Sequence, residues 1–240
     1  MLVDLSEASA RRGGSAHLSG YLGAPMSPGP HPGVVVVHEA FGLDENTRRH
    51  TQRLASMGYV ALAVDLFSAG GAVRCLAATM VSFRRGRGRA FTDIETARLS
   101  LLGREDVNDR IGIIGFCLGG AFALLTAEAD TYRAASVNYG MLPRTLDGLS
   151  GLCPVVASYG GADRSLSGAA DILEEEFSRH GIPHDVYEYD GTGHSFLNEV
   201  PAGPRPLRPL LRVCGIGPDQ AAASDAWDRI EAFFDTHLRG

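Results

Sequence analysis

Short apolar runs alternate with amphipathic segments along most of the chain. Five of these runs predict strands, at 33–39, 59–65, 110–116, 154–160 and 185–191. Most of them are continuously apolar, which is typical of parallel strands that are covered on both faces. A weaker run at 134–140 predicts a sixth strand, and residues 16–23 form a candidate edge strand.

Helical periodicity fills the intervals between these runs. Helices are predicted at 46–57, 92–102, about 117–129, 167–180 and 224–238. Thr92 and Glu95 have the spacing of a capping box, and Gly181 marks the end of the fourth helix. The alternation predicts an α/β fold, in which helices cover both faces of a mostly parallel sheet. The length fits one domain over residues 1–240.

Composition narrows the classes of partner. The chain is 45% hydrophobic and 21% charged, and its net charge of −6 gives no electrostatic reason to expect a nucleic-acid or anionic-membrane partner. Its four cysteines are widely spaced and form no CxxC pair, which argues against a zinc site and a disulfide framework. We find no apolar core of signal-peptide length and no run of 18 apolar residues, so we expect a cytoplasmic protein without a membrane segment.

The stretch GIIGFCLGG at 112–120 places a thiol between a predicted strand and a predicted helix. Gly115 and Gly119 flank Cys117 in the G-x-nucleophile-x-G pattern of a nucleophile elbow, a turn too tight for side chains at its flanks. A helix N-terminus also stabilises a thiolate. The alternative is a small buried core residue, which is what we expect of the other three cysteines. The flanking glycines favour a nucleophile over a core residue at Cys117.

A thiol nucleophile needs a base, and the base needs an acid that orients it. Asp163 lies in the loop after the strand at 154–160, and His194 lies in the loop after the next strand. Parallel strands end at the same edge of a sheet, so both residues are expected beside Cys117. The order nucleophile, acid, histidine is that of α/β-hydrolases. Asp190 is an alternative acid, but it ends the strand that leads to His194, so we favour Asp163.

These segments together resemble the dienelactone hydrolases (carboxymethylenebutenolidases) of the α/β-hydrolase superfamily. The resemblance runs from GVVVVHEAFGLDENTRRHTQRLASMGYVALAVDLF through IGIIGFCLGG, YGGADRS and GTGHSF to AWDRIEAFF. It implies an α/β-hydrolase fold that hydrolyses a small ester or lactone without a metal or cofactor. The implied Cys–His–Asp triad consists of Cys117, His194 and Asp163. Glu39 in HEAFG matches a family glutamate that interacts with the thiol.

The loop after the early strand and the residue after the nucleophile supply the oxyanion hole of an α/β-hydrolase. The corresponding backbone N–H groups are those of Ala40 and Leu118. The family's best-known members hold a substrate carboxylate with an arginine that follows the catalytic histidine, and this position matches Asn198. The arginines between 84 and 89 lie in the region that could supply a second arginine for the substrate carboxylate. The alternative is that they form a solvated loop. Dienelactone and another ester or lactone therefore both remain open as substrate.

Residues 199–218 form a long connection after the predicted histidine. Four prolines at 201–209 argue against a regular helix, yet several leucines make the segment too apolar for a free loop. We expect it to cover the mouth of the site with an apolar wall, and to offer Arg205, Arg208 or Arg212 in place of the missing arginine. A surface loop that packs away from the site is the alternative.

Other function classes fit the sequence less well. A catalytically silent hydrolase-fold protein that binds a small ligand would leave an intact triad without a role. GFCLGG does not match G-x-G-x-x-G, and SVNYG ends without an acidic residue for a ribose, which disfavours a nucleotide site. HEAFG lacks the second histidine of H-E-x-x-H, which disfavours a metallohydrolase. The oligomeric state stays open.

Overall fold

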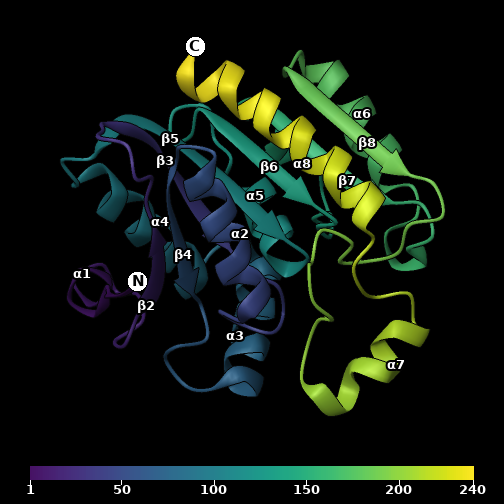
Figure 1. Cartoon of the computed structure of the whole chain (residues 1–240), viewed down its shortest axis with the longest axis horizontal. Coiled ribbons are helices and arrows are strands. Elements are labelled where there is room, and N and C mark those ends of the chain that lie inside the picture. The colour runs from purple at the N-terminus through teal and green to yellow at the C-terminus, as the bar shows by residue number, and fades with distance from the viewer.

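An eight-stranded sheet forms the centre of the molecule (Figure 1). The computed structural model describes the backbone of residues 1–240 and all side chains except those of Ala72, Val73 and Asp147. The strand order is β1-β2-β4-β3-β5-β6-β7-β8; β3 to β8 are parallel, and β2 pairs antiparallel with β1 and β4. The strands are β1 Leu2–Asp4, β2 Ser19–Gly23, β3 His31–Val37, β4 Val60–Asp65, β5 Val107–Phe116, β6 Ala134–Asn138, β7 Val155–Gly160 and β8 His184–Tyr189.

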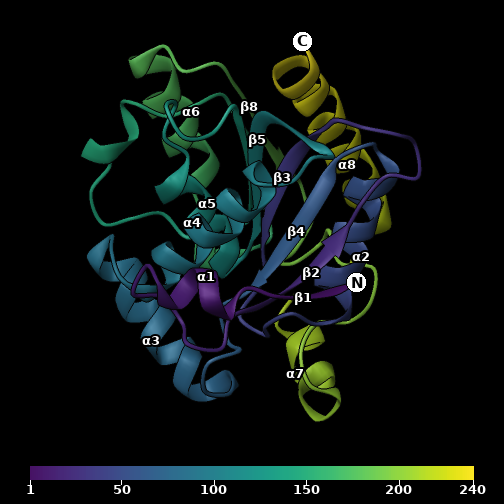
Figure 2. The ribbon, with the colours of Figure 1, turned by 90° about the vertical axis from the view of Figure 1, so that its left-hand side faces the viewer.

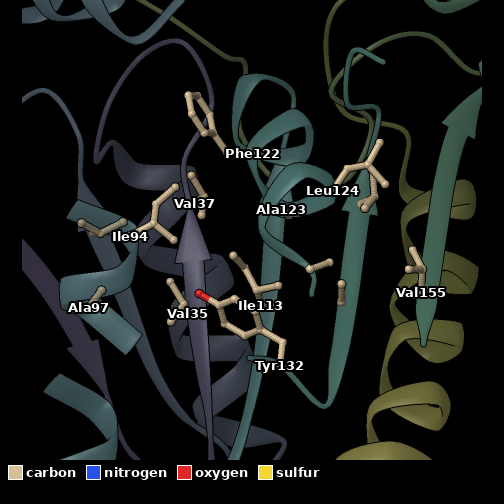
Figure 3. Packing of buried hydrophobic residues seen from close by; sticks show 14 of the residues in the cluster. Val35, Val37, Ile94, Ala97, Ile113, Phe122, Ala123, Leu124, Tyr132 and Val155 are labelled. Carbon is tan, nitrogen blue, oxygen red and sulfur yellow. The ribbon is translucent and has the colours of Figure 1, made fainter. Parts of the chain in front are cut away.

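Helices cover both faces of this sheet (Figure 2). The helices are α1 Ser6–Ala10, α2 Glu45–Ser56, α3 Ala72–Arg85, α4 Arg89–Leu102, α5 Leu118–Thr126, α6 Ala169–His180, α7 Arg208–Val213 and α8 Gln220–Phe234, and a π-helical turn, Asp235–Arg239, follows α8. Val34 and Val36 of β3 pack in one apolar layer with α2 and α8. Val35 and Val37 pack in the opposite layer with α4 and α5 (Figure 3). This two-sided burial explains why the strand reads as continuously apolar.

The sequence prediction of an α/β fold is confirmed, with several local corrections. Residues 16–23 do not form an edge strand, because the three-residue strand β1 lies outside β2. The capping box is wrong: α4 begins at Arg89 after Gly88, which places Thr92 inside the helix. The arginine-rich stretch 83–91 is mostly helical, since α3 ends and α4 begins within it. Within the described residues, no helix combines the length and apolar character that crossing a bilayer requires.

The proline-rich segment also differs from its prediction. It contains a 3₁₀ turn, Arg205–Leu207, that leads into α7. Pro209 occupies the first turn of α7, where a backbone N–H would have no acceptor within the helix, so a proline is tolerated there. Both views show α7 projecting from the body of the molecule (Figures 1 and 2).

Candidate active site

Cys117 forms the turn between β5 and α5. It is the single residue between Phe116, which ends the strand, and Leu118, which begins the helix. Its backbone has φ 54° and ψ −115°, a conformation that L-residues rarely adopt. The turn is crowded: a Cβ at Gly119 would lie 2.5 Å from the carbonyl carbon of Val37. Glycine is therefore required at the flank, as the elbow pattern predicts.

The loops after β7 and β8 bring Asp163 and His194 together. His194 Nδ1 lies 2.5 Å from Asp163 Oδ2, and the carboxylate accepts, so Nδ1 carries the proton. Asp163 also accepts from the backbone N–H of Ser165 at 3.0 Å and from its hydroxyl at 2.6 Å. These bonds orient the imidazole and leave Nε2 available to a partner on its other side.

Charge in this cluster favours an imidazolium. Burial alone would lower the pKa of His194, but hydrogen bonds to Asp163 and Cys117 and their negative charge raise it to about 10. Burial opposes ionisation of Asp163, yet its hydrogen bonds to His194 and Ser165 lower its pKa below the usual value. The imidazole of His194 therefore interacts with the carboxylate of Asp163 and with the thiol of Cys117.

Glu39 lies two residues beyond the end of β3 and is buried. Its carboxyl oxygens each accept from Asn198 Nδ2 at 3.2 Å. Burial raises the pKa of Glu39, while the charge of His194 and the hydrogen bond from Asn198 act in the opposite direction. The structure therefore brings Glu39 close to the Cys117 cluster, as the sequence predicts, and shows that Asn198 contacts it directly.

Backbone strain concentrates around this cluster. Among the described residues, three that are not glycine have positive φ: Cys117 at 54°, Tyr139 at 40° and Ser195 at 59°. Tyr139 follows β6, and its ring packs edge-on against the His194 ring with centroids 5.1 Å apart. Sequence patterns identified neither Tyr139 nor Ser195 as part of the site, because a positive φ at these residues leaves no compositional signal.

The predicted oxyanion donors flank the same turn. Leu118 is the first residue of α5, so its N–H precedes the helical hydrogen-bond ladder. Ala40 follows Glu39 in the loop after β3. Among the described side chains, no group of three histidine, cysteine, aspartate or glutamate residues is arranged to hold a metal ion.

The other cysteines follow their prediction only in part. Cys75 and Cys153 are buried in the apolar core, and burial raises the pKa of Cys153 to about 12. Cys214 is exposed, so the expectation that it is a core residue is wrong. It lies directly after α7, a helix with no buried residue to anchor the thiol.

The segment after His194 returns to the histidine loop. His194 donates its backbone N–H to Gly215 O at 2.9 Å, and its carbonyl accepts from Gly217 N–H at 2.9 Å. The two backbone stretches lie so close together that a Cβ at Gly193 would lie 3.0 Å from the Gly215 carbonyl carbon. The end of the segment therefore supports the backbone of the predicted catalytic histidine.

The side chains of this segment do not form the expected apolar wall. Leu207 and Leu210 are 48% and 62% exposed, because α7 projects from the body of the molecule. Its arginines line a cavity of about 860 Å³ beside the loops that carry Asp163 and His194. Lining residues are Ala162, Gly193, Arg205, Arg208, Arg212 and Ile216, among others.

Known proteins are similar to this chain in sequence and in fold. A model of the dienelactone hydrolase family matches residues 18–238. A putative carboxymethylenebutenolidase of Synechocystis is 26% identical over 92% of this chain and 93% of its own. The carboxymethylenebutenolidase of Rhodococcus opacus is 27% identical over 91% of this chain and 86% of its own.

Solved structures agree on the architecture. A putative dienelactone hydrolase from Klebsiella pneumoniae superposes with a TM-score of 0.75 at 23% identity, covering 98% of both chains. A dienelactone hydrolase-like promiscuous phosphotriesterase from metagenomic libraries gives a TM-score of 0.82 at 24% identity, covering 99% of this chain and 98% of its own. The fold is that of the α/β-hydrolases.

Proposed function

Because this chain belongs to the dienelactone hydrolase family and is an ester or lactone hydrolase, we propose that it cleaves its substrate through a thioester on Cys117. The observation that carries the proposal is the strained turn at Cys117, next to the hydrogen-bonded pair of His194 and Asp163. Strain of this kind persists where surrounding structure enforces it, and it is concentrated at active sites.

The reaction then proceeds in two halves. The thiol of Cys117 passes its proton to His194, and the sulfur attacks the carbonyl carbon. The carbonyl oxygen becomes an oxyanion that faces the N–H groups of Ala40 and Leu118. Collapse of this intermediate breaks the C–O bond, and the His194 imidazolium donates its proton to the departing alkoxide. A water molecule, deprotonated by neutral His194, then attacks the thioester. The C–S bond breaks, the acid product is released, and the sulfur takes the proton back from His194. Asp163 holds the imidazole in place in both halves.

Glu39 is proposed to control the charge state of the thiol. A buried carboxyl group near the sulfur can hydrogen-bond the protonated thiol or accept its proton when a substrate enters. Burial raises the pKa of Glu39, which brings its proton exchange closer to neutral pH than that of an exposed glutamate. We therefore expect Glu39→Gln to change the pH dependence of Cys117 alkylation.

The substrate's acidic group, where it has one, is proposed to face the cavity lined by Arg205, Arg208 and Arg212. Asn198 stands at the position where the family's best-known members carry an arginine. Its amide is neutral, buried and hydrogen-bonded to Glu39, so it does not replace that arginine as a binding group for a carboxylate. The cavity lies next to the residues that precede Asp163 and His194.

The test is a panel of small esters and lactones assayed with the wild type and with Cys117→Ala. Rapid quenching and mass spectrometry should find an acyl group on Cys117 during turnover, and Cys117→Ala should be inactive. Cys214→Ala is the matched control, because it removes an exposed thiol that does not lie in the turn between β5 and α5. Full activity in Cys117→Ala would overturn the proposal. A wild type that binds but never acylates would indicate a silent ligand-binding protein.

A further inference from the structure

A buried chain of hydrogen bonds leads from α2 to Glu39. Asn198 donates through Nδ2 to both Glu39 oxygens at 3.2 Å, and its Oδ1 lies 3.2 Å from His50 Nε2. All three side chains are nearly inaccessible, with exposures of 2% for His50, 4% for Glu39 and 2% for Asn198. Buried polar groups of this kind must satisfy one another. None of the reaction steps above uses His50 or explains its burial.

The chain has one self-consistent direction. When Glu39 is ionised its carboxylate only accepts, so the Asn198 amide must then present its NH₂ group to Glu39 and its oxygen to His50. That oxygen in turn requires a proton on His50 Nε2. Each donor therefore points toward Glu39, and a turned amide would break both contacts at once.

Two aromatic rings pack against His50. Its ring stacks on Phe116 with centroids 4.2 Å apart, and Phe116 is the residue before the proposed nucleophile. The Trp227 ring of α8 lies 5.5 Å away. The imidazole thus joins the base of the nucleophile turn to the residue that contacts Glu39.

Charged neighbours of His50 do not make it a cation. Burial lowers its pKa to about 4, although the hydrogen bond to Asn198 and the charges of Asp44 and Glu199 oppose this; Arg53 acts in the same direction as burial. At neutral pH the imidazole is therefore a neutral donor. Asn198 and His50 therefore give Glu39 oriented hydrogen bonds without placing a positive charge beside it.

The groups that face Glu39 from other elements are His194, Ser195, Tyr139 and Asp44. The charge of His194 and the side chains of Asn198 and Ser195 favour the ionised carboxylate, whereas Asp44 disfavours it. Tyr139 is neutral, because burial and then the charge of Glu39 raise its pKa well above the usual value.

We propose that His50 and Asn198 are positioning residues, which act through Glu39 to set the pH at which the proposed nucleophile becomes reactive. The inference rests on the proposed function, since it assigns Glu39 to the thiol. A neutral His–Asn pair occupies the place where a cation would make the carboxylate ionise early. Its hydrogen bonds favour the carboxylate less strongly than a cation would, and they hold the geometry of Glu39.

The test measures two titrations in wild type, His50→Leu and His50→Gln: the rate of Cys117 alkylation by iodoacetamide, and the ¹³C shift of the Glu39 carboxyl group. In His50→Leu the amide of Asn198 loses its orientation, so we expect Glu39 to titrate about half to one pH unit higher, the size of one lost hydrogen bond. Alkylation should follow the same shift. His50→Gln retains a donor and should restore most of the wild-type profile. His17→Leu, at an exposed histidine, is the control.

Asn198→Arg supplies a positive charge and should shift the Glu39 titration in the opposite direction, to lower pH. A purely structural role for His50 predicts reduced stability with an unmoved Glu39 titration, and that result would overturn the inference. A Glu39 shift without any change in alkylation supports the hydrogen-bond chain and counts instead against the role of Glu39 in the proposed function.

Discussion

Gly119 provides a sharp test of how the fold positions Cys117. A methyl group at this residue would lie 2.5 Å from the Val37 carbonyl carbon and 2.7 Å from His38 O. Both atoms belong to the backbone, so no side-chain rotation relieves the overlap. β3 is paired with β4 on one side and β5 on the other. The N-terminus of α5 must therefore move instead.

The size of that movement sets the expected effect. Non-bonded carbon atoms prefer separations of about 3.5–4.0 Å, so α5 must retreat by roughly 1 Å. Overpacking of a core costs about 1–3 kcal/mol, and a 1 Å displacement of catalytic groups costs about 10²-fold in rate. Cys117 and Leu118 precede Gly119 in the same turn, so the sulfur and a proposed oxyanion donor both shift. We expect Gly119→Ala to lower kcat/KM by about 100-fold and the free energy of unfolding by about 1–3 kcal/mol.

Ester hydrolysis and urea unfolding of the purified variant measure the two effects. Gly151→Ala is the matched control, because a Cβ at Gly151 meets no heavy atom within 4 Å. Its free energy of unfolding should stay within about 0.5 kcal/mol of the wild type, and its activity should not change. Wild-type activity and stability in Gly119→Ala would show that contact with β3 does not position the nucleophile turn.

Three further predictions concern the acid, the histidine and the segment that follows it. Asp163→Asn should lower turnover by up to about 10⁴-fold, as loss of the orienting acid does in serine-protease triads, and near-normal turnover would remove Asp163 from the triad. The raised pKa of His194 means that the folded state keeps a proton that the unfolded state loses above pH 6.5, so the free energy of unfolding should fall as pH rises toward 10. Urea midpoints should show a weaker decline in His194→Gln, and an equal decline would contradict the assignment. Replacing residues 203–214 by a short Gly/Ser linker should lower kcat/KM for acidic esters more than for neutral ones, while the circular dichroism spectrum is retained. An unchanged substrate ranking would exclude the arginine-lined cavity from substrate binding.

The positions of three proposed site residues can be predicted from the sequence for a geometric reason. Cys117, Asp163 and His194 each follow an apolar run that becomes a parallel strand. Parallel strands end at one edge of a sheet, so residues far apart in the chain are brought together without any knowledge of side-chain contacts. Of the two candidate acids, Asp163 is the residue that contacts His194 Nδ1 in the structure.

What the sequence could not predict depends on contacts between distant residues or on local context. His50 and Asn198 are 148 positions apart, and nothing in the pattern of either segment indicates that they meet. β1 has only three residues, too few to establish a periodicity. The rule against prolines in helices failed at α7, because the rule applies to the interior of a helix and Pro209 lies in the first turn.

The strained residues of the site are held by the edge of the sheet itself. Cys117 donates its backbone N–H to Asn138 O at 3.0 Å, and Tyr139 donates to Ser158 O at 2.7 Å, so each turn is tied to the end of the neighbouring strand. A positive φ at a residue other than glycine costs about 1–3 kcal/mol, and it persists only where surrounding structure enforces it. Cys117 and Tyr139 are therefore fixed by the folded sheet before any substrate arrives. Donors and a nucleophile that are already in place need little reorganisation during the proposed reaction, and this is how the proposed site would stabilise an oxyanion.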